Sequence, residues 1–463
     1  MSEWIDRSLP EIAGAFRENI LSPRELLEEA IGRHERWDKQ LNAYKTWDAE
    51  YARHQADAAD LSFTKGYDLG PAQGILFSVK DIYGAYGFPI FAGSPNRLPK
   101  EWEQDGPVVS EIRQQLAIVP GKTHTVEFAF GGLGTNAHWG TPRNPWDAQN
   151  HRTPGGSSSG AGVSLWEGSA LIAFGTDTGG SVRVPASMTG NVGLKTTKGL
   201  WSTELITVLS SSFDTPGILA KSVTDIAFGF TGIDPEARAA GSPKIELREV
   251  NNLTIGLTKD YFWDRCEDDV GKVVEEAISN LVDKGAKTTS IVIPEASSAM
   301  NAWGDGAVVA SEGYAFLQNR LPDWLKTLDP NVLVRMETAI NAKTLDYISA
   351  FYHISQLSNS VCEKLETVDV LAVPTVPITP PLVSDVVDPD EYKKLNLLAL
   401  SNSMPGNVLG LCAITIPVGL DKSGMPVGLQ LMARPNHENE LLSLALGIEK
   451  VIGTPLQRLG SPP

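Results

Sequence analysis

The sequence predicts an α/β fold in which a mixed central β-sheet is covered by helices on both faces. Short apolar runs bounded by glycine or proline recur along the chain. These runs lack polar alternation, which is typical of strands buried on both faces. Segments with helical periodicity separate them, as expected when helices pack on a parallel or mixed sheet. The 463 residues are enough for two lobes or one large sheet.

Seven apolar runs are the expected strands. In chain order they are GILFSVK (74–80), LAIVPG (116–121), LIAFGTD (171–177), LTIGLT (253–258), VLAVPT (370–375), AITIPVG (413–419) and VGLQLMA (427–433).

Helices are expected over residues 24–37, 270–284 and 344–365. The first follows a capping box, Ser22-Pro-Arg-Glu25, with a proline at the first helical position, where its missing N–H costs nothing. Residues 385–394 are polar and interrupted by proline, which favours a surface loop. We find no internal repeat, and we expect one domain over residues 1–463, whose residues 1–60 form a helical segment that packs on the core.

Composition and charge exclude several classes of protein. With 42% hydrophobic and 21% charged residues the chain has the balance of a folded globular protein. A net charge of −17 disfavours direct binding of nucleic acid. Three dispersed cysteines indicate reduced thiols and a cytoplasmic location, and no metal-binding spacing is present. No signal peptide or apolar run of about 20 residues indicates secretion or a membrane span.

The stretch PGGSSSGAG, residues 154–162, has the composition of a flexible linker. However, it is short and leads directly into the apolar segment VSLWEGSALIAFG. A Gly/Ser turn that feeds a helix exposes backbone N–H groups and accepts anions. We therefore interpret this stretch as a functional turn.

A second small-residue stretch, GTDTGGSVR over residues 175–183, follows the expected strand 171–177. Ligand sites of α/β sheets collect at such strand ends. Paired glycines allow N–H groups to converge beside a hydroxyl, which is what an oxyanion hole beside a nucleophile requires.

Two competing motifs carry less weight. Residues 156–160 match the G-x-S-x-G nucleophile elbow, which would make Ser158 the nucleophile, but a loop rather than a strand precedes them. Residues 132–137 resemble a dinucleotide fingerprint without the βαβ continuation that this site needs. The histidines, among them His124 and His437, lie in no base-carrying motif, so a nucleophilic serine needs another base.

Lys80 ends the expected strand GILFSVK, where burial favours the neutral amine. On its own, this position favours a lysine that reaches solvent from a strand end. In this order, GILFSVKD, PGGSSSG and GTDTGGSVRVPAS resemble the amidase signature family. The resemblance covers nearly the whole chain, from SPRELLEEAIGRHERW to NVLGLCAITIPVGLDKSGMPVGLQLMA. It implies the amidase signature fold, an α/β/α arrangement.

The resemblance also implies roles for residues. Ser181 is the nucleophile, Ser157 the bridging hydroxyl and Lys80 the general base, and the peptide Gly156–Ser157 is cis in family members. The N–H groups expected to form the oxyanion hole belong to Thr178, Gly179, Gly180 and Ser181. Gly156 and Ser158 are expected to support the turn, and Asp177 and Arg183 to brace the loop. No metal or cofactor is implied.

The implied reaction is hydrolysis of a carboxylic amide of a small molecule through an acyl-enzyme. One alternative is the glutaminase subunit of a tRNA-dependent amidotransferase, which holds glutamine with an arginine on a late helix and an acidic residue after the last strand. Here that helix, AFYHISQLSNSV, has no arginine, and the acidic position falls near His437, although Glu438 or Glu440 could substitute.

Two further alternatives are a hydrolase of allophanate, urea derivatives or carbamates, and a noncatalytic scaffold. We expect residues 201–212 and 303–316 to line the substrate pocket, no membrane contact, and, by analogy with the family, a possible homodimer through the N-terminal helices.

Overall fold

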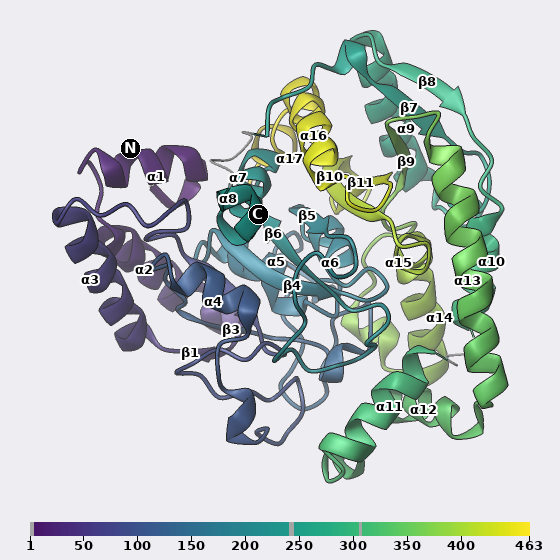
Figure 1. Ribbon diagram of the computed structural model, residues 1–463, viewed down its shortest axis with the longest axis horizontal. Coiled ribbons are helices and arrows are strands. Elements are labelled where there is room, and N and C mark those ends of the chain that lie inside the picture. Colours follow the sequence, from purple (N-terminus) through teal and green to yellow (C-terminus); the bar gives the residue numbers. More distant parts are fainter. Residues whose placement is uncertain (1–3, 240–244, 305–307) are drawn as a thin grey trace.

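The computed structural model, which describes residues 4–239, 245–304 and 308–463, is built around one twisted sheet (Figure 1). Its eleven strands lie in the order β1-β3-β2-β4-β6-β5-β10-β11-β9-β7-β8. The bounds are β1 (Tyr44–Trp47), β2 (Phe77–Lys80), β3 (Gly121–Thr123), β4 (Ile172–Asp177), β5 (Val192–Lys195), β6 (Thr215–Ala220), β7 (Thr254–Leu257), β8 (Lys287–Ser290), β9 (Val370–Pro374), β10 (Cys412–Leu420) and β11 (Pro426–Ala433).

The sheet is mixed, as predicted. β2 runs parallel to both β3 and β4, and β7 runs parallel to β8 and β9, whereas the strands between these groups pair antiparallel. Parallel neighbours end at the same edge of a sheet. The ends of β2 and β4 therefore bring Lys80 beside the segment that begins at Thr176.

Helices cover both faces of the sheet, which confirms the predicted fold class. α5 and α6 pack on one face, where they contact β4 and β5, and α7, α9 and α16 pack on the other (Figure 1). The bounds are α1 (Leu9–Arg17), α2 (Pro23–Leu41), α3 (Ala49–Thr64), α4 (Pro107–Arg113), α5 (Ser159–Glu167), α6 (Arg183–Met188), α7 (Val223–Ile233), α8 (Pro235–Ala239), α9 (Asp268–Asp283), α10 (Glu295–Gly304), α11 (Val309–Arg320), α12 (Pro330–Met336), α13 (Thr344–Leu365), α14 (Pro389–Leu400), α15 (Met404–Val408), α16 (Glu438–Ile452) and α17 (Pro455–Leu459).

The start of α2 shows how local sequence sets an element. The Ser22 hydroxyl accepts the Glu25 N–H at 3.1 Å, and the Glu25 carboxylate accepts the Ser22 N–H at 2.9 Å. This reciprocal cap, with Pro23 as the first helical residue, forms the predicted capping box. The buried face of α2 includes Leu26, Leu27 and Ile31, so the helix is fixed to the core by its apolar stripe.

Several elements differ from the sequence prediction. Residues 385–394 are not a loop, because Asp388 caps α14 and Pro389 is its first residue. The strand expected over residues 116–121 is reduced to a bridge at Ile118, and β3 begins at Gly121. The N-terminal segment also supplies β1, which the helical prediction did not include. Among the described residues, no helix is long and apolar enough to span a bilayer.

Candidate active site

The two small-residue stretches meet at the ends of β2 and β4. Ser157 lies just before α5, and the peptide Gly156–Ser157 is cis, as the family resemblance predicts. The backbone passes so close to the neighbouring loop that a Cβ at Gly156 would lie 2.6 Å from the Gly134 nitrogen. Glycine is therefore required where the two loops touch.

Lys80 is fully buried and reaches both stretches. Its Nζ lies 2.7 Å from Oγ of Ser157 and 2.8 Å from Oγ1 of Thr176. Burial lowers the pKa of Lys80 to about 7, although the negative charges of Asp214 and Asp177 act in the opposite direction. A substantial fraction of the amine is thus neutral near pH 7, as a general base must be.

Ser181 lies in the lining of a cavity of about 290 Å³ together with Thr178 and Gly179. Its backbone carbonyl accepts the Ser158 N–H at 3.4 Å, so the two stretches are in contact. Within the described part of the chain, however, no hydrogen bond joins the hydroxyl of Ser181 to that of Ser157. The structure therefore forms one link of the predicted relay, Lys80 to Ser157. The second link requires the Ser181 side chain to turn toward Ser157, and catalytic contacts often tighten only when substrate binds.

The predicted oxyanion donors do not all remain available. The Gly180 N–H donates to Oδ1 of Asp177 at 2.7 Å, so it is already engaged within the loop. The N–H groups of Thr178, Gly179 and Ser181 donate to no acceptor within the described residues. Gly180 still needs to be glycine, because its φ is +131° and a Cβ would overlap the hydroxyl of Ser403.

Asp177 and Arg183 form a fully buried ion pair behind this loop. The guanidinium donates to both carboxylate oxygens, from Nη2 at 2.8 Å and Nε at 3.0 Å. Arg183 also donates to the Ser403 carbonyl oxygen at 2.9 Å, and these contacts hold the pKa of Asp177 well below its usual range despite burial. The pair braces the loop and does not face the cavity.

Ser158 is fully buried and does not line the cavity. Its hydroxyl lies 3.4 Å from the Thr176 nitrogen and 3.5 Å from the Thr176 carbonyl oxygen, so it ties the start of α5 to β4. The strand that a nucleophile elbow requires is missing directly before it. This geometry supports the structural role predicted for Ser158 over the elbow interpretation.

The cavity lining contains residues that sequence reasoning predicted and residues that it missed. Leu209, Trp303 and Val309 come from the two predicted lining segments, of which residues 305–307 lie outside the described residues. The remaining lining residues are Ala129, Phe130, Gly131, Arg335, Thr338, Lys393, Asn396, Leu397, Leu400 and Met404. They belong to segments far apart in the sequence, and no local motif marks them.

Arg335 is one of the two cations among the described residues that line this cavity. It lies on α12, upstream of the late helix in which the sequence shows no arginine. Its Nε donates to the Asn331 carbonyl oxygen at 3.1 Å, its Nη2 donates to the Phe130 carbonyl oxygen, and the guanidinium lies over the Phe130 ring. Within the described residues Arg335 forms no ion pair, and no aspartate or glutamate is among the residues that line this cavity.

Comparison with known proteins agrees with this site. The family model described as Amidase matches residues 25–442. The chain belongs to the amidase family. It is 46% identical to 2-amino-5-chloromuconic acid deaminase of Comamonas testosteroni, covering 98% of each chain, and 30% identical to a glutamyl-tRNA(Gln) amidotransferase subunit of Geobacter sp. (strain M21), covering 97% and 98%. A crystal structure of an amidase superimposes with a TM-score of 0.86 at 28% identity, covering 96% of this chain and 100% of the other.

These findings confirm the predicted activity class: this amidase is an enzyme that hydrolyses amide C–N bonds. The positions considered for glutamine binding lie elsewhere in it. Glu438 is buried and accepts the Thr197 N–H at 2.5 Å, and His437 contacts the Pro435 carbonyl oxygen at 2.9 Å. Neither they nor Glu440 line the cavity beside Ser181.

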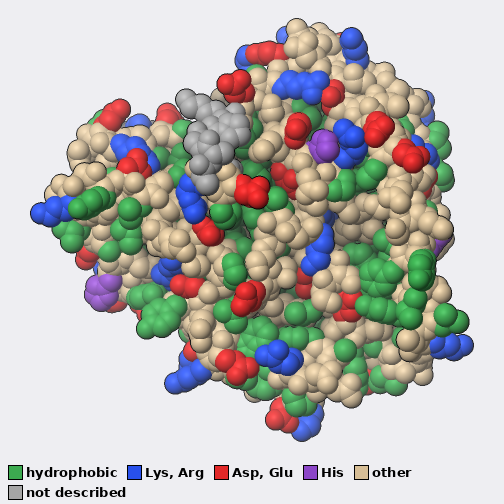
Figure 2. All heavy atoms as spheres, in the orientation of Figure 1, with side chains coloured by type: hydrophobic (Ala, Val, Ile, Leu, Met, Phe, Trp, Pro, Cys, Tyr) green, Lys and Arg blue, Asp and Glu red, His purple; other side chains and the backbone are tan. Residues whose placement is uncertain are grey.

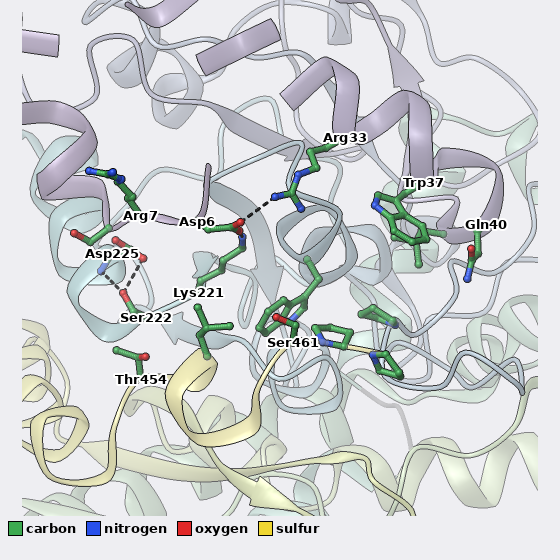
Figure 3. A pocket seen from close by; sticks show the side chains of 17 residues that line it. Asp6, Arg7, Arg33, Trp37, Gln40, Lys221, Ser222, Asp225, Thr454 and Ser461 are labelled. Atoms are coloured by element: carbon green, nitrogen blue, oxygen red, sulfur yellow. Dashed lines mark hydrogen bonds and ion pairs between the residues drawn. The ribbon is translucent and has the colours of Figure 1, made fainter. Parts of the chain in front are cut away.

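This amidase has a larger cavity, of about 490 Å³, which shares no lining residue with the cavity beside Ser181. Figure 3 shows its lining. Asp6 pairs there with Arg33 at 2.9 Å and with Lys221 at 3.1 Å, and Asp225 accepts the Leu9 N–H. Asp6, Arg33 and Lys221 are thus paired with one another, and the cavity marks the joint between the N-terminal helices and the C-terminal segment.

One side-chain cluster in the described residues has the composition of a metal site. The ligand atoms of His34, Asp38 and Glu167 lie within 4.8 Å of one another. Nδ1 of His34 contacts Glu167 directly at 3.2 Å, and Ser169 donates to the same carboxylate oxygen. The contact between His34 and Glu167 joins α2 to α5, so we assign the cluster a structural role, although Oε1 of Glu167 forms no hydrogen bond within the described residues.

Proposed function

We propose that this amidase cleaves its substrate through an acyl-enzyme on Ser181, with Ser157 and Lys80 as the proton relay. The observation that carries the proposal is the 2.7 Å contact between Nζ of buried Lys80 and Oγ of Ser157, in a turn whose next residue, Ser158, donates its N–H to the Ser181 carbonyl oxygen. A buried lysine next to a hydroxyl is a base that needs no histidine.

In the proposed cycle, neutral Lys80 takes the proton of Ser157 while Ser157 takes the proton of Ser181. The Ser181 oxygen then bonds to the amide carbon, and the carbonyl oxygen becomes an oxyanion that faces the free N–H groups of Thr178, Gly179 and Ser181. When the C–N bond breaks, the proton returns through Ser157 to the departing amine. Water hydrolyses the ester by the same relay and releases the acid. Preorganised N–H donors of this kind each contribute about 3 kcal/mol to lowering the barrier.

Trapping the intermediate tests this proposal. The wild-type protein is mixed with an activated anilide or ester, quenched in acid, and weighed intact by mass spectrometry. We expect a mass increase equal to the acyl group, and peptide mapping should place it on Ser181. An acyl group on Ser158 would contradict the assignment. Turnover of a panel of amides without any adduct on a serine would contradict it as well.

We further propose that the substrate carries a carboxylate. Among the described residues that line the cavity, Arg335 and Lys393 are the two cations and none is acidic, and a guanidinium without an ion pair there suits bidentate binding of a carboxylate. The remaining lining, which includes Trp303, Leu209 and Met404, suits a short apolar chain. The name of the 46% identical relative, which describes an acid as the substrate of that protein, supports this substrate class.

Replacing Arg335 by methionine is expected to lower kcat/KM for the half-amide of a short dicarboxylic acid by about 10- to 100-fold. A hydrogen bond to a charged group contributes about 1.5–3 kcal/mol, and about 1.4 kcal/mol corresponds to tenfold. The methyl ester of the same half-amide should change little, because it offers no charge to the guanidinium. Steady-state kinetics on the matched pair measure the difference.

The control for this variant is Lys393→Met, which removes the exposed cation of the lining. Solvent screening should make its effect smaller than that of Arg335→Met. Equal losses on the acid and on its ester in Arg335→Met would show that the arginine supports the fold of the cavity and does not recognise a carboxylate.

The amidotransferase subunit, the hydrolase of urea derivatives or carbamates, and the noncatalytic scaffold are the competing functions. The fixed positions of Glu438 and His437 and the higher identity to the deaminase favour a free-standing hydrolase. Hydrolysis of small amides by the chain alone supports our proposal. Glutaminase activity that appears only with added subunits would support the amidotransferase subunit. A preference for carbamates or ureas would support the hydrolase of those compounds. Absence of any activity and of any serine labelling would support the noncatalytic scaffold.

We also propose a cytoplasmic, single-domain protein without cofactor that forms a homodimer through its N-terminal helices. Ile20, Leu61 and Tyr67, which lie on or next to these helices, are large exposed hydrophobic residues, and such residues collect at interfaces. Hydrophobic side chains also gather along the edge that α13 occupies, where Leu345 and Tyr352 are exposed (Figure 2). Light scattering of the wild type and of Leu61→Asp, together with cell fractionation, tests these proposals.

A further inference from the structure

A buried carboxylate that the proposed relay does not use lies between two walls of the cavity. Asp214, directly before β6, is 5% exposed. Its Oδ1 accepts the Thr178 hydroxyl at 2.6 Å, and its Oδ2 accepts the N–H groups of Leu209 and Ser210 at 3.0 Å each. Within the described residues no side chain forms an ion pair with it, since Lys198 donates to its backbone carbonyl oxygen instead.

The partners of Asp214 belong to two separate segments that line the cavity. Thr178 is part of the loop that offers free N–H groups beside Ser181, and Leu209 lines the same cavity from the segment before β6. The three hydrogen bonds therefore fix the distance between the proposed oxyanion loop and the facing wall. An interaction that holds a donor within a few tenths of an ångström of its position affects catalysis directly.

The segment that contains Leu209 and Ser210 is also held in place by α11. Glu312 on α11 accepts the hydroxyl of Ser210 at 2.5 Å and the N–H of Ser212 at 3.0 Å. The segment from Leu209 to Asp214 is thus clamped between two carboxylates, and it cannot move away from Thr178 without breaking contacts on both sides. This clamp makes Asp214 a rigid link to Thr178.

The charge of Asp214 also acts on Lys80. Asp214 and Asp177 are the carboxylates whose charges favour the protonated form of Lys80, against the opposing effect of burial. The other titratable or charged groups that face this pair are Tyr83, whose hydroxyl donates to the Gly175 carbonyl oxygen, and Lys198. Removing a nearby negative charge lowers the proton affinity of a buried amine.

We propose that Asp214 is a positioning residue of the amidase reaction: its hydrogen bonds fix Thr178 against Leu209, and its buried carboxylate acts on the relay as a negative charge. This inference rests on the proposed function of Ser181 and Lys80. It assigns two separable effects to one side chain: a tether, which acts on the rate, and a charge, which acts on the pH dependence of the rate.

The test compares Asp214→Asn, which keeps the shape and removes the charge, with Thr178→Val, which removes the tether and keeps the charge. Thr178→Val should lower kcat/KM on the plateau by about 10- to 100-fold. Asp214→Asn should lower it less, because the amide oxygen can accept the N–H groups of Leu209 and Ser210 while the amide nitrogen donates to the Thr178 hydroxyl. In Asp214→Asn the acid limb of the pH profile should also move to lower pH by about one unit, because Lys80 loses a favourable negative charge. In Thr178→Val the acid limb should stay at the wild-type pH, and Thr178→Ser should recover most of the rate.

A second readout separates this inference from the proposed function. The rate of labelling by a fluorophosphonate is measured against pH in the same variants, with circular dichroism as a check of folding. Absence of labelling at Ser181 in the wild type would overturn the proposed function. Labelling of the wild type with an unshifted acid limb in Asp214→Asn would overturn the role of its charge. Should Asp214→Asn fail to fold, wild-type rates in Thr178→Val would overturn the tether.

Discussion

Replacing Ser181 by alanine is expected to lower kcat for amide hydrolysis by about 10⁵-fold or more, the scale of loss when the nucleophile of a serine hydrolase is removed. Ser181 has the hydroxyl that shares the 290 Å³ cavity with the free N–H groups of Thr178 and Gly179. Without it no acyl-enzyme forms, and the remaining donors stabilise only the slow attack of water. Steady-state kinetics and fluorophosphonate labelling measure the effect, and we expect both turnover and labelling to be lost.

Ser158→Ala is the matched control, because this neighbouring serine is buried and its hydroxyl, within the part of the chain that the structure describes, forms hydrogen bonds only with Thr176, at 3.4 and 3.5 Å. We expect it to keep activity within about tenfold of the wild type, as the loss of one weak hydrogen bond implies. Retained turnover in Ser181→Ala together with an inactive, unlabelled Ser158→Ala would transfer the nucleophile to the elbow motif.

The strands that could be predicted from the sequence are those whose side chains are apolar on both faces. β4, β7, β9, β10 and β11 lie within one residue of the predicted runs at each end. β8 was missed because its four residues, KTTS, are all exposed at the edge of the sheet. The buried strands β5 (VGLK) and β6 (TPGILA) were missed as well, because each has too short an uninterrupted apolar run to stand out in the sequence. A long buried run leaves a pattern in the sequence, whereas a short strand or pairing at an exposed edge leaves almost none.

The misassigned start of α14 has a different cause. Its first turn carries Asp390 and Glu391 after Pro389, a composition shared by loops and by helix N-termini. Asp388 decides between them, because its carboxylate accepts the N–H groups of both acidic residues and caps the helix. The proline that was interpreted as a breaker is a favourable first residue.

Within the site, sequence reasoning found residues that act through local geometry. Asp177 and Gly180 lie in one tight loop, so their relation could be interpreted from the motif, although the glycine N–H turned out to be bound by the aspartate. Arg335 lines the cavity, and Asp214 contacts Thr178, through the packing of distant segments. Such contacts depend on how elements are placed in three dimensions, and no spacing along the chain encodes them.

Activity is expected to fall as the pH drops through about 7, because the base of the relay must be neutral. Burial lowers the pKa of Lys80 to about 7, so the amine accepts a proton above this pH and is an ammonium below it. A single group of this kind gives an acid limb in which kcat/KM decreases about tenfold per pH unit. Lys80→Met should lower kcat/KM at pH 8 by about 10²- to 10⁴-fold, and Lys80→Arg should not recover it, because a guanidinium stays protonated.

The structure supplies a matched control in Lys195, a second fully buried lysine whose pKa burial lowers to about 8. Its Nζ donates to the carbonyl oxygens of Thr196 and Leu411 at 2.8 Å each and touches neither serine of the relay. Lys195→Met can therefore cost stability while leaving the acid limb at the wild-type pH. A flat wild-type profile between pH 5 and 8 would remove Lys80 from the role of base. An acid limb that moves in Lys195→Met would do the same, because the limb would then report the titration of a different amine.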